Sequence, residues 1–272
     1  MVKLACIQMT SGPDLEDNLD QAAKLIREAA KQGATFIATP ENTCRMRAKV
    51  EDKFASAWDE KQHPGLDFFV KLAKELTVTL LLGSLSSVKL GDGRLANRSF
   101  LILPDGEIAA RYDKIHMFDV SLENGEVYKE SATHAPGRDA VIADLPFAKL
   151  GLTICYDVRF AALYRALAQF GAEIIAVPAA FTVPTGKAHW ETLLRARAIE
   201  TGAYIIAPAQ CGMHEGGRGT WGHSMIISPW GEILAEAGDT PCVITADFDA
   251  ARVKEARSAV PSLTHDREFS AP

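Results

Sequence analysis

The sequence predicts an α/β protein whose sheets combine parallel and antiparallel strands. Apolar runs that are typical of strands alternate with stretches of helical periodicity along most of the chain. Two turns of the form Pro-x-Gly-Glu, at 104–107 and 229–232, join neighbouring apolar runs as hairpins. The chain contains no linker rich in Pro, Gly or Ser and no low-complexity tract, so we expect residues 1–272 to form a single domain.

The individual elements follow from the spacing of the apolar residues. The strands are expected at residues 3–9, 35–40, 78–84, 98–103, 149–155, 173–179, 203–209, 223–228 and 242–248. The helices are expected at residues 17–33, 159–171 and 189–202, and each of these stretches ends at a glycine, which suits a C-terminal cap. Strand-helix-strand units occur in both halves of the chain, which is compatible with an internal duplication.

Composition and charge exclude several classes of protein. The 272 residues carry a net charge of −6 with both signs spread along the chain, which argues against nucleic acid or an anionic membrane as a partner. The five cysteines are widely spaced, and neither a Cys-x-x-Cys pair nor a histidine cluster with zinc-ligand spacing occurs. We therefore expect reduced thiols in a cytoplasmic protein without a metal site. The first residues lack the features of a signal peptide, and no apolar run is long enough to cross a bilayer.

Three strand ends carry chemically useful side chains. In α/β sheets the chemistry lies beyond the carboxyl ends of the strands. The run at 35–40 leads into Glu41, the stretch 107–118 places Lys114 soon after a strand, and the run at 149–154 leads into Cys155. A carboxylate, an ammonium group and a thiol are the set that acyl transfer from an amide requires.

The thiol needs activation, because an unperturbed cysteine has a pKa of about 8.5 and is only roughly 3% thiolate at neutral pH. We expect a helix that begins near Asp157 or Val158 to point its positive end at the sulfur, and Glu41 to take the proton as the acyl bond forms. Full ionisation gains about 2 kcal/mol, whereas one oxyanion donor typically contributes about 2.7–4 kcal/mol. Lys114 and the backbone N–H of Tyr156 are therefore expected to matter more than the resting charge of the thiol.

Each of these residues also has an ordinary structural interpretation. A cysteine at a strand end is commonly a small buried hydrophobe, a glutamate after proline a solvated turn residue, and a lone lysine a surface group. A papain-like pair of Cys155 with His116 is a further alternative, and it requires His116→Ala to be inactive and Lys114→Ala to be tolerated. The occurrence of all three groups at separate strand ends favours the catalytic interpretation.

Three segments together resemble the nitrilase superfamily of carbon–nitrogen hydrolases. The segments are PEN at 40–42, DKIHMFDV at 113–120 and GLTICYDVRF at 151–160, and they match the motifs of the Glu-Lys-Cys triad in order and setting. The resemblance extends over nearly the whole chain. It implies a four-layer αββα sandwich, with Glu41 as general base, Lys114 as oxyanion stabiliser and Cys155 as nucleophile. Glu130 takes the place of a second family glutamate and is expected to orient Lys114 or the substrate.

Within the superfamily, the sequence CYDVRF at 155–160 is similar to that of the Nit-type amidases, whereas true nitrilases carry Trp-Glu after the cysteine. This resemblance implies hydrolysis, through a cysteine thioester and without a cofactor, of a linear amide of a small carboxylate. Deaminated glutathione or a related 2-oxo acid amide is the expected substrate. The alternatives are omega-amidase activity on α-ketoglutaramate, hydrolysis of N-carbamoyl or aliphatic amides, and an inactive dimeric scaffold. The C-terminal tail, from about residue 253 onward, contributes to dimer contacts in the family, so we expect a homodimer or a higher homo-oligomer.

Three further residues and one segment are candidates for substrate binding. Arg159 suits a substrate carboxylate, with an ion pair on the first turn of its helix as the alternative. His189, expected near the start of a helix, is a candidate pocket residue, with a satisfied buried imidazole as the alternative. Thr185 is a candidate substrate contact through the family resemblance. The glycine-rich stretch 211–224 lacks the P-loop pattern and is interpreted either as a flexible hairpin or as an active-site lid.

Overall fold

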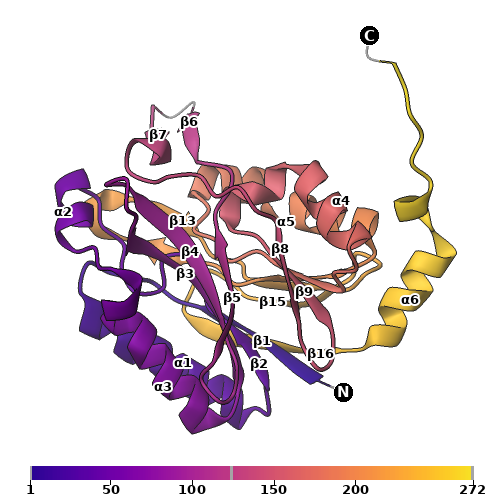
Figure 1. The fold of residues 1–272 in the computed structure, drawn as a ribbon, viewed down its shortest axis with the longest axis horizontal. Coiled ribbons are helices and arrows are strands. Elements are labelled where there is room, and N and C mark those ends of the chain that lie inside the picture. Colours follow the sequence, from indigo (N-terminus) through magenta and orange to yellow (C-terminus); the bar gives the residue numbers. More distant parts are fainter. Residues whose placement is uncertain (1, 123–124, 271–272) are drawn as a thin grey trace.

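Two six-stranded sheets pack face to face in the computed structural model, which describes residues 2–122 and 125–270 (Figure 1). The first sheet has the strand order β16 (Cys242–Phe248), β1 (Val2–Gln8), β2 (Phe36–Ala38), β3 (Thr79–Lys89), β4 (Leu95–Ile102) and β5 (Ile108–Asp113). The second has the order β15 (Ile233–Glu236), β14 (Met225–Ile227), β11 (Tyr204–Ala207), β10 (Ile174–Ala176), β9 (Lys149–Leu152) and β8 (Val141–Asp144). Two small ribbons lie outside these sheets: β6 (Asp119–Ser121) with β7 (Val127–Lys129), and β12 (Cys211–Met213) with β13 (Gly219–Trp221). Residue 1, residues 123–124 and residues 271–272 of the predicted domain lie outside the described residues.

The two sheets repeat one topology. The centre of each sheet consists of three parallel strands, which are β1, β2 and β3 in the first and β9, β10 and β11 in the second. One antiparallel strand, β16 or β8, flanks this centre on one side, and an antiparallel hairpin, β4–β5 or β14–β15, flanks it on the other. This correspondence agrees with the internal duplication that the sequence suggests, and both predicted Pro-x-Gly-Glu turns form the tips of these hairpins.

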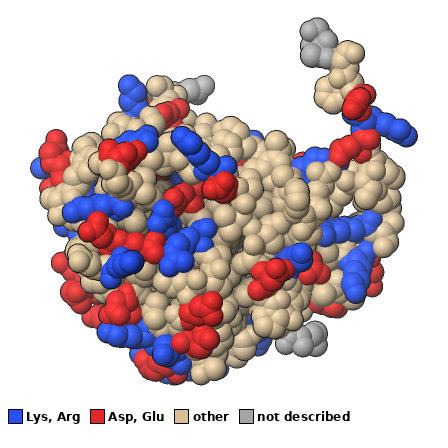
Figure 2. All heavy atoms as spheres, in the orientation of Figure 1, with Lys and Arg blue, Asp and Glu red and all other residues tan. Residues whose placement is uncertain are grey.

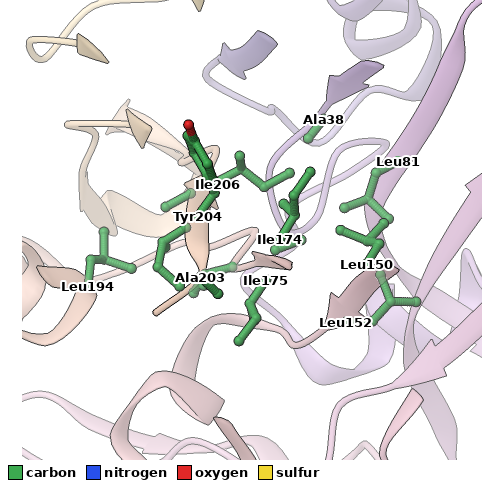
Figure 3. Close-up of a cluster of buried hydrophobic side chains, with 14 of the residues drawn as sticks. Ala38, Leu81, Leu150, Leu152, Ile174, Ile175, Leu194, Ala203, Tyr204 and Ile206 are labelled. Carbon is green, nitrogen blue, oxygen red and sulfur yellow. The ribbon is translucent and has the colours of Figure 1, made fainter. Parts of the chain in front are cut away.

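Helices cover the outer face of each sheet and complete a four-layer arrangement. Helices α1 (Leu15–Lys31) and α3 (Pro64–Leu76) connect the parallel strands of the first sheet, and α4 (Ala161–Gln169) and α5 (Val183–Thr201) connect those of the second. Between the sheets, Ala38 and Leu81 of the first sheet lie in one buried cluster with Leu150, Leu152 and Ile174 of the second (Figure 3). A second cluster lies between the first sheet and its two helices. The predicted αββα sandwich is therefore confirmed.

The predicted helix at 17–33 corresponds closely to α1. The Asp14 carboxylate caps its first turn by accepting the Asp17 N–H at 3.2 Å. The apolar residues at helical spacing are buried, among them Leu19, Ala22 and Ile26. Gly33 follows the end of the helix with a φ of 87°, a conformation that glycine adopts without strain.

Two helices differ from the prediction. Helix α5 begins at Val183, six residues before the predicted start at His189, with Pro184 in its first turn. Thr185 therefore lies in the first turn of α5, and His189 lies inside the helix. Helix α3 was not predicted; Thr77 adopts a φ of 54° at its end, so the glycine that would mark a helix terminus is absent there. Two further helices, α2 (Val50–Ala55) and α6 (Ala250–Ala259), are short.

The surface carries lysine and arginine intermixed with aspartate and glutamate on the face that Figure 2 shows. None of the helices within the described ranges combines the length and the apolarity that crossing a membrane needs. After α6 the chain extends away from the body of the molecule (Figure 1). Arg165 donates to the carbonyl of Ser262 at 3.0 Å and forms an ion pair with Asp266, while Phe269 is exposed. The role of this tail in dimer contacts stays a prediction.

Candidate active site

The three predicted residues each follow a strand of the two large sheets. Glu41 follows β2, Lys114 directly follows β5, and Cys155 follows β9. All three are buried, with exposed fractions of 3% for Glu41, 2% for Lys114 and 6% for Cys155. The interpretations of Glu41 as a solvated turn residue and of Lys114 as a surface group are therefore wrong. Because a buried charge is costly unless it is paired, both charged groups require partners.

The ammonium group of Lys114 lies between two carboxylates. Its Nζ atom is 2.9 Å from Glu41 Oε1 and 2.8 Å from Glu130 Oε2. Burial by itself would lower the pKa of Lys114, but the charges of Glu130 and Glu41 raise it well above its ordinary value. Burial likewise opposes the ionisation of Glu130, yet Lys114 and His134 lower its pKa below the ordinary range. At neutral pH Lys114 is therefore a fixed cation and Glu130 a fixed anion.

Asn97 on β4 joins the two carboxylates, and sequence reasoning missed it. Its Nδ2 atom donates to Glu41 Oε1 at 2.9 Å and to Glu130 Oε1 at 3.1 Å. Its backbone carbonyl accepts the N–H of Lys114 at 3.0 Å. Asn97 thus fixes the carboxylates of Glu41 and Glu130 through its side chain and the backbone of Lys114 through its carbonyl. The sequence held only a weak signal for Asn97, because the polar residues Arg98 and Ser99 follow it in the same strand.

Cys155 adopts a backbone conformation that few residues other than glycine adopt. Its φ is 51°, in the left-handed region, and its N–H donates to the carbonyl of Pro178 at 2.9 Å. The predicted helix start near Asp157 or Val158 is wrong, because residues Cys155–Arg159 form a single 3₁₀ turn and α4 begins at Ala161. Phe160 separates the two with a ψ of 86°, which no helix accommodates.

The thiol rests in its neutral form. Burial raises the pKa of Cys155 well above its ordinary value, and the Glu41 carboxylate beside the sulfur raises it further, while Lys114 and a backbone hydrogen bond with Ala180 act in the opposite direction. The expected lowering of the pKa by a helix dipole is therefore wrong. A neutral thiol beside a carboxylate is an arrangement in which the carboxylate can accept the proton as the sulfur attacks.

Asp157 holds the turn that carries Cys155. It is fully buried, and its carboxylate accepts the Ile154 N–H at 2.9 Å, the Tyr112 hydroxyl at 2.7 Å and the His116 N–H at 3.0 Å. The ring nitrogen Nδ1 of His116 also lies 2.7 Å from Asp157. Because this ring is bonded to Asp157, and because no hydrogen bond joins it to Cys155 within the described residues, the papain-like alternative lacks its essential contact.

Glu41 is held from the second half of the chain. The side-chain amide of Gln210 donates to the backbone carbonyl of Glu41 at 3.0 Å. The next residue, Asn42, has a φ of 61°, and its N–H donates to Ser84 Oγ at 3.0 Å. A second left-handed residue thus lies beside the site, where such strain is commonly found.

A cavity of about 560 Å³ opens beside Glu41 and Glu130, a size that is typical of ligand pockets. A smaller hollow borders Cys155, and Phe118 and Arg218 line both spaces. Residues 214–218 of the glycine-rich stretch lie between β12 and β13 and form part of the cavity wall. This stretch is therefore an element of the cavity, and its closure as a lid stays a prediction.

The remaining predicted residues lie at different distances from this centre. Tyr156 and Thr185 line the smaller hollow beside Cys155. Arg159 does not line either space. Its guanidinium stacks over the rings of Tyr156 at 5.7 Å and Phe181 at 5.6 Å. It also donates to Nδ1 of His189 at 3.3 Å. Arg159 forms no ion pair within the described residues, so the alternative of an ion pair on the first turn of its helix is wrong. His189 is exposed on α5, which rules out the buried imidazole.

Comparison with known proteins gives a consistent result. The family described as carbon-nitrogen hydrolase matches residues 3–258. The chain is 45% identical over 267 residues to a deaminated glutathione amidase of Synechocystis sp., with 96% of each chain covered. It is 36% identical over 268 residues to omega-amidase NIT2-B of Xenopus laevis, with 98% of this chain and 95% of that protein covered.

A solved structure extends this likeness to the fold. The NitFhit protein of C. elegans superposes with a TM-score of 0.91 at 34% sequence identity. The match covers 98% of this chain and 65% of that chain, so this chain spans about two thirds of the length of NitFhit. Because the family match and the relatives each extend over nearly all of its residues, this chain belongs to the carbon–nitrogen hydrolase family.

Proposed function

We propose that this chain is a thiol-dependent amidase that hydrolyses a linear amide of a small carboxylate through a cysteine thioester. The observation that carries the proposal is the buried cluster in which Lys114 lies between Glu41 and Glu130, beside the Cys155 thiol. Both relatives described above are named as amidases. A nucleophile, a base and a cationic donor at one cavity are the groups that acyl transfer from an amide needs.

In the first half-reaction, the Cys155 sulfur attacks the amide carbon while Glu41 accepts the thiol proton. The electron pair of the carbonyl moves to its oxygen, which accepts hydrogen bonds from Lys114 and from the Tyr156 N–H. An ammonium group has three N–H donors, and Lys114 gives two of them to carboxylates, so one remains for the oxyanion. The intermediate then collapses, Glu41 protonates the departing amine, and a thioester remains on Cys155.

In the second half-reaction, water attacks the thioester carbon and gives its proton to Glu41. The same two donors stabilise the second oxyanion, and the Cys155 sulfur leaves and takes back a proton from Glu41 as the acid is released. Glu130 exchanges no proton in this scheme, because its lowered pKa keeps it ionised; it positions Lys114. Since the thiol rests neutral, most of the acceleration comes from proton transfer and from the two oxyanion donors. One oxyanion donor is typically worth about 2.7–4 kcal/mol.

The proposed substrate is deaminated glutathione or another 2-oxo acid ω-amide. The experiment measures amine and ammonia release from deaminated glutathione, α-ketoglutaramate, an N-carbamoyl amine and an aliphatic amide, with Cys155→Ala as the blank. The highest kcat/KM is expected for deaminated glutathione, while faster turnover of α-ketoglutaramate would make the chain an omega-amidase.

Two other outcomes would overturn different parts of the proposal. Turnover of only the other amides would reject the 2-oxo acid class and leave the amidase. If no amide is hydrolysed and iodoacetamide labels all five cysteines equally slowly, with no protection by the amides, the chain is an inactive scaffold.

We also propose that the chain works as a homo-oligomer in the cytoplasm. Ile199 and Trp230 are 56% and 63% exposed, and Arg195 links their elements by donating to the carbonyl of Gly231 at 3.0 Å. Exposed apolar residues that lie together suit a subunit contact. All five cysteines are free thiols, which suits a reducing compartment. Light scattering is expected to show an oligomer that Ile199→Asp weakens, and a monomeric wild type would contradict this.

A further inference from the structure

His116 holds the turn that carries Cys155 at two points. Its backbone N–H and its ring atom Nδ1 lie 3.0 Å and 2.7 Å from Asp157 Oδ1, and because a carboxylate only accepts, Nδ1 carries the proton of this bond. The ring also stacks on that of Phe160, with the ring centroids 3.5 Å apart and the planes at 8°. Asp157 lies within the 3₁₀ turn at 155–159, and Phe160 directly follows it. A side chain from outside the turn therefore fixes both its middle and its end.

Asp157 depends on these donors because it is fully buried. Its Oδ2 atom accepts the Ile154 N–H at 2.9 Å and the Tyr112 hydroxyl at 2.7 Å, and its Oδ1 atom accepts both bonds from His116. An ionised carboxylate offers about four lone-pair sites, so these four bonds satisfy it. Without the imidazole ring, Oδ1 keeps only the backbone N–H of residue 116, and a buried charge that loses a partner is destabilised.

A chain of contacts returns from Phe160 to Lys114. Phe160 packs edge-on against Tyr156 with 5.4 Å between the ring centroids, and Tyr156 packs edge-on against Phe118 at 5.2 Å. The N–H of Phe118 donates to Glu130 Oε2 at 2.8 Å. The same oxygen lies 2.8 Å from Lys114 Nζ, so the aromatic chain ends at the ammonium group.

His116 closes these contacts into a loop, because it stands two residues after Lys114 along the chain and bonds to Asp157. The loop contains both donors that the proposed mechanism assigns to the oxyanion, which are the Lys114 ammonium and the Tyr156 N–H. Lys114 follows a strand of the first sheet and Tyr156 a strand of the second, so tertiary contacts alone set their separation. Oxyanion donors are effective only about 2.7–3.1 Å from the atom on which the charge develops.

We infer that His116 is a positioning residue that keeps the Lys114 ammonium and the Tyr156 N–H directed at one oxygen. The inference rests on the proposed amidase function and adds a residue to that same site. His116 lines neither the cavity nor the smaller hollow, and no hydrogen bond joins it to Cys155 within the described residues. Its loss should therefore weaken the stabilisation of an oxyanion and leave the reactivity of the sulfur itself unchanged.

Two reactions of the Cys155 thiol separate these effects. With iodoacetamide, an S–C bond forms, iodide leaves and the thiol proton is lost to Glu41, while no oxygen gains charge. With glutaric semialdehyde, which carries an aldehyde in place of a terminal amide, an S–C bond forms and the carbonyl electron pair moves to the oxygen. The thiol proton again goes to Glu41. Only the aldehyde adduct needs the two oxyanion donors.

His116→Ala is expected to lower kcat on the amides by about 100-fold, the loss that one misplaced oxyanion donor typically causes, with KM changed much less. The dissociation constant of the aldehyde should rise by a similar factor, while the rate constant of alkylation should stay within about twofold. In His116→Asn the side-chain amide can still donate to Asp157. This variant should regain about tenfold of both losses, because a hydrogen bond to a charged group is worth at least that much.

His223→Asn is the matched control. His223 also stacks on an aromatic ring, that of Trp221 at 4.1 Å and 9°, and its Nδ1 atom also has a partner, the Trp221 carbonyl at 2.8 Å. It lines neither space beside the site, and asparagine tolerates its φ of 54°. All three measured quantities should remain close to those of the wild type.

Three results would overturn the inference. Unchanged kcat and aldehyde affinity in His116→Ala would show that the donors are positioned without it. Equal losses in alkylation and aldehyde binding would show that the histidine acts on the thiol, as a papain-like pair would, or only supports the fold. Recovery by His116→Asn no greater than that of the alanine variant would exclude the bond to Asp157 as the cause.

The aldehyde also separates this inference from the proposed function. If the wild type hydrolyses no amide, the amidase proposal fails, but the aldehyde affinities of the wild type, His116→Ala and His116→Asn still decide the role of His116. If His116→Ala does not fold, as judged by circular dichroism, the comparison of His116→Asn with the wild type gives the same test. No reaction of the wild-type thiol with the aldehyde would overturn the inference as well.

Discussion

Two groups of charged side chains border the same cavity and differ in how completely they are paired. In the lysine cluster, formed by Glu41, Asn97, Lys114 and Glu130, the ammonium and both carboxylates have hydrogen-bond partners at 2.8–3.1 Å. In the arginine wall, formed by the cavity-lining residues Arg45, Arg47 and Arg218, each guanidinium keeps a buried Nε donor without a partner within the described residues. Three members of the cluster follow strands and Asn97 lies within β4, whereas the three arginines lie on the segment after Glu41 and on the glycine-rich stretch.

The difference separates two tasks. Chemistry at the amide needs donors and acceptors that are already oriented before the substrate arrives, because reorganisation during the reaction would cost free energy. Recognition of an anion needs donors that remain free until the ligand supplies their partner. Substitutions in the cluster should therefore affect both rate and stability, whereas substitutions in the wall should affect binding alone.

The largest effect is expected at the proposed nucleophile, Cys155. Cys155→Ala should lower kcat/KM by about 10⁴-fold or more, because the thioester cannot form. Cys242→Ala, which replaces a half-buried thiol on β16, is the control and should remain active. The kcat/KM of both variants is measured by amine release from deaminated glutathione. Comparable activity of Cys155→Ala and the wild type would refute the assignment of the nucleophile.

Lys114→Met should break the cluster. It leaves Glu41 and Glu130 buried without their cation, which is expected to cost about 3–5 kcal/mol in the free energy of unfolding as well as most of the activity. Arg45→Gln is the comparison, since it removes a charge that has no ion pair within the described residues. Urea denaturation measures the free energy of unfolding of both variants. Equal losses of stability in Lys114→Met and Arg45→Gln would show that the lysine cluster and the arginines do not differ in pairing.

Asn97→Ala tests the neutral member of the cluster. Two hydrogen bonds to carboxylates are lost, and bonds of this kind contribute about 1.5–3 kcal/mol each. We expect kcat to fall by about tenfold or more, with KM changed less, because Glu41 and Glu130 keep their charges but each loses a hydrogen bond that fixes its orientation. Ser99→Ala, two residues along β4, is the control for a polar substitution in this strand. An unchanged kcat in Asn97→Ala would remove Asn97 from the site.

The pH dependence of stability should report Glu130. Its pKa in the folded chain is lowered to about 2, against about 4.3 for an unperturbed glutamate. Its contribution is therefore fully present above about pH 4.3 and is lost as the pH falls through this interval, on the order of 3 kcal/mol in all. The free energy of unfolding of Glu130→Gln should vary less between pH 5 and pH 2 than that of the wild type. Parallel curves would contradict this.

The smallest effect on stability is expected in the wall. Arg45→Gln should change the free energy of unfolding by no more than about 0.5 kcal/mol, because it removes a guanidinium that repels Arg47 and has no paired carboxylate. A thermal or urea melt measures this change. A loss of 2 kcal/mol or more would show that Arg45 is part of the structural framework rather than a free binding group.

The central strands and the residues at their ends could be predicted because apolar periodicity indicates both. Glu41, Lys114 and Cys155 were each identified from the strand that precedes them. The arginine wall could not be found in this way, since arginines in loops usually lie in solvent. Two distant segments meet beside these arginines. Gly216 lies so close to Ala48 that a Cβ added to Gly216 would be only 2.7 Å from the Ala48 side chain.

The turn after Cys155 was mispredicted for a related reason. The sequence CYDVRF has the composition of a helix start, but the carboxylate of Asp157 bonds to Ile154, Tyr112 and His116. Tyr112 and His116 come from a segment about 40 residues earlier, as the separations of 45 and 41 residues show. A pattern of local propensities does not contain contacts of this range.

The division of the site between the two sheets affects how the chain acquires activity. Glu41 and Lys114 follow strands of the first sheet and Cys155 a strand of the second, and Gln210 bonds to Glu41 across a separation of 169 residues. Closing such long loops is slow, so helices and hairpins form before the sheets dock. During refolding, enzymatic turnover should thus return after the far-ultraviolet circular dichroism signal, and neither half expressed alone should hydrolyse an amide.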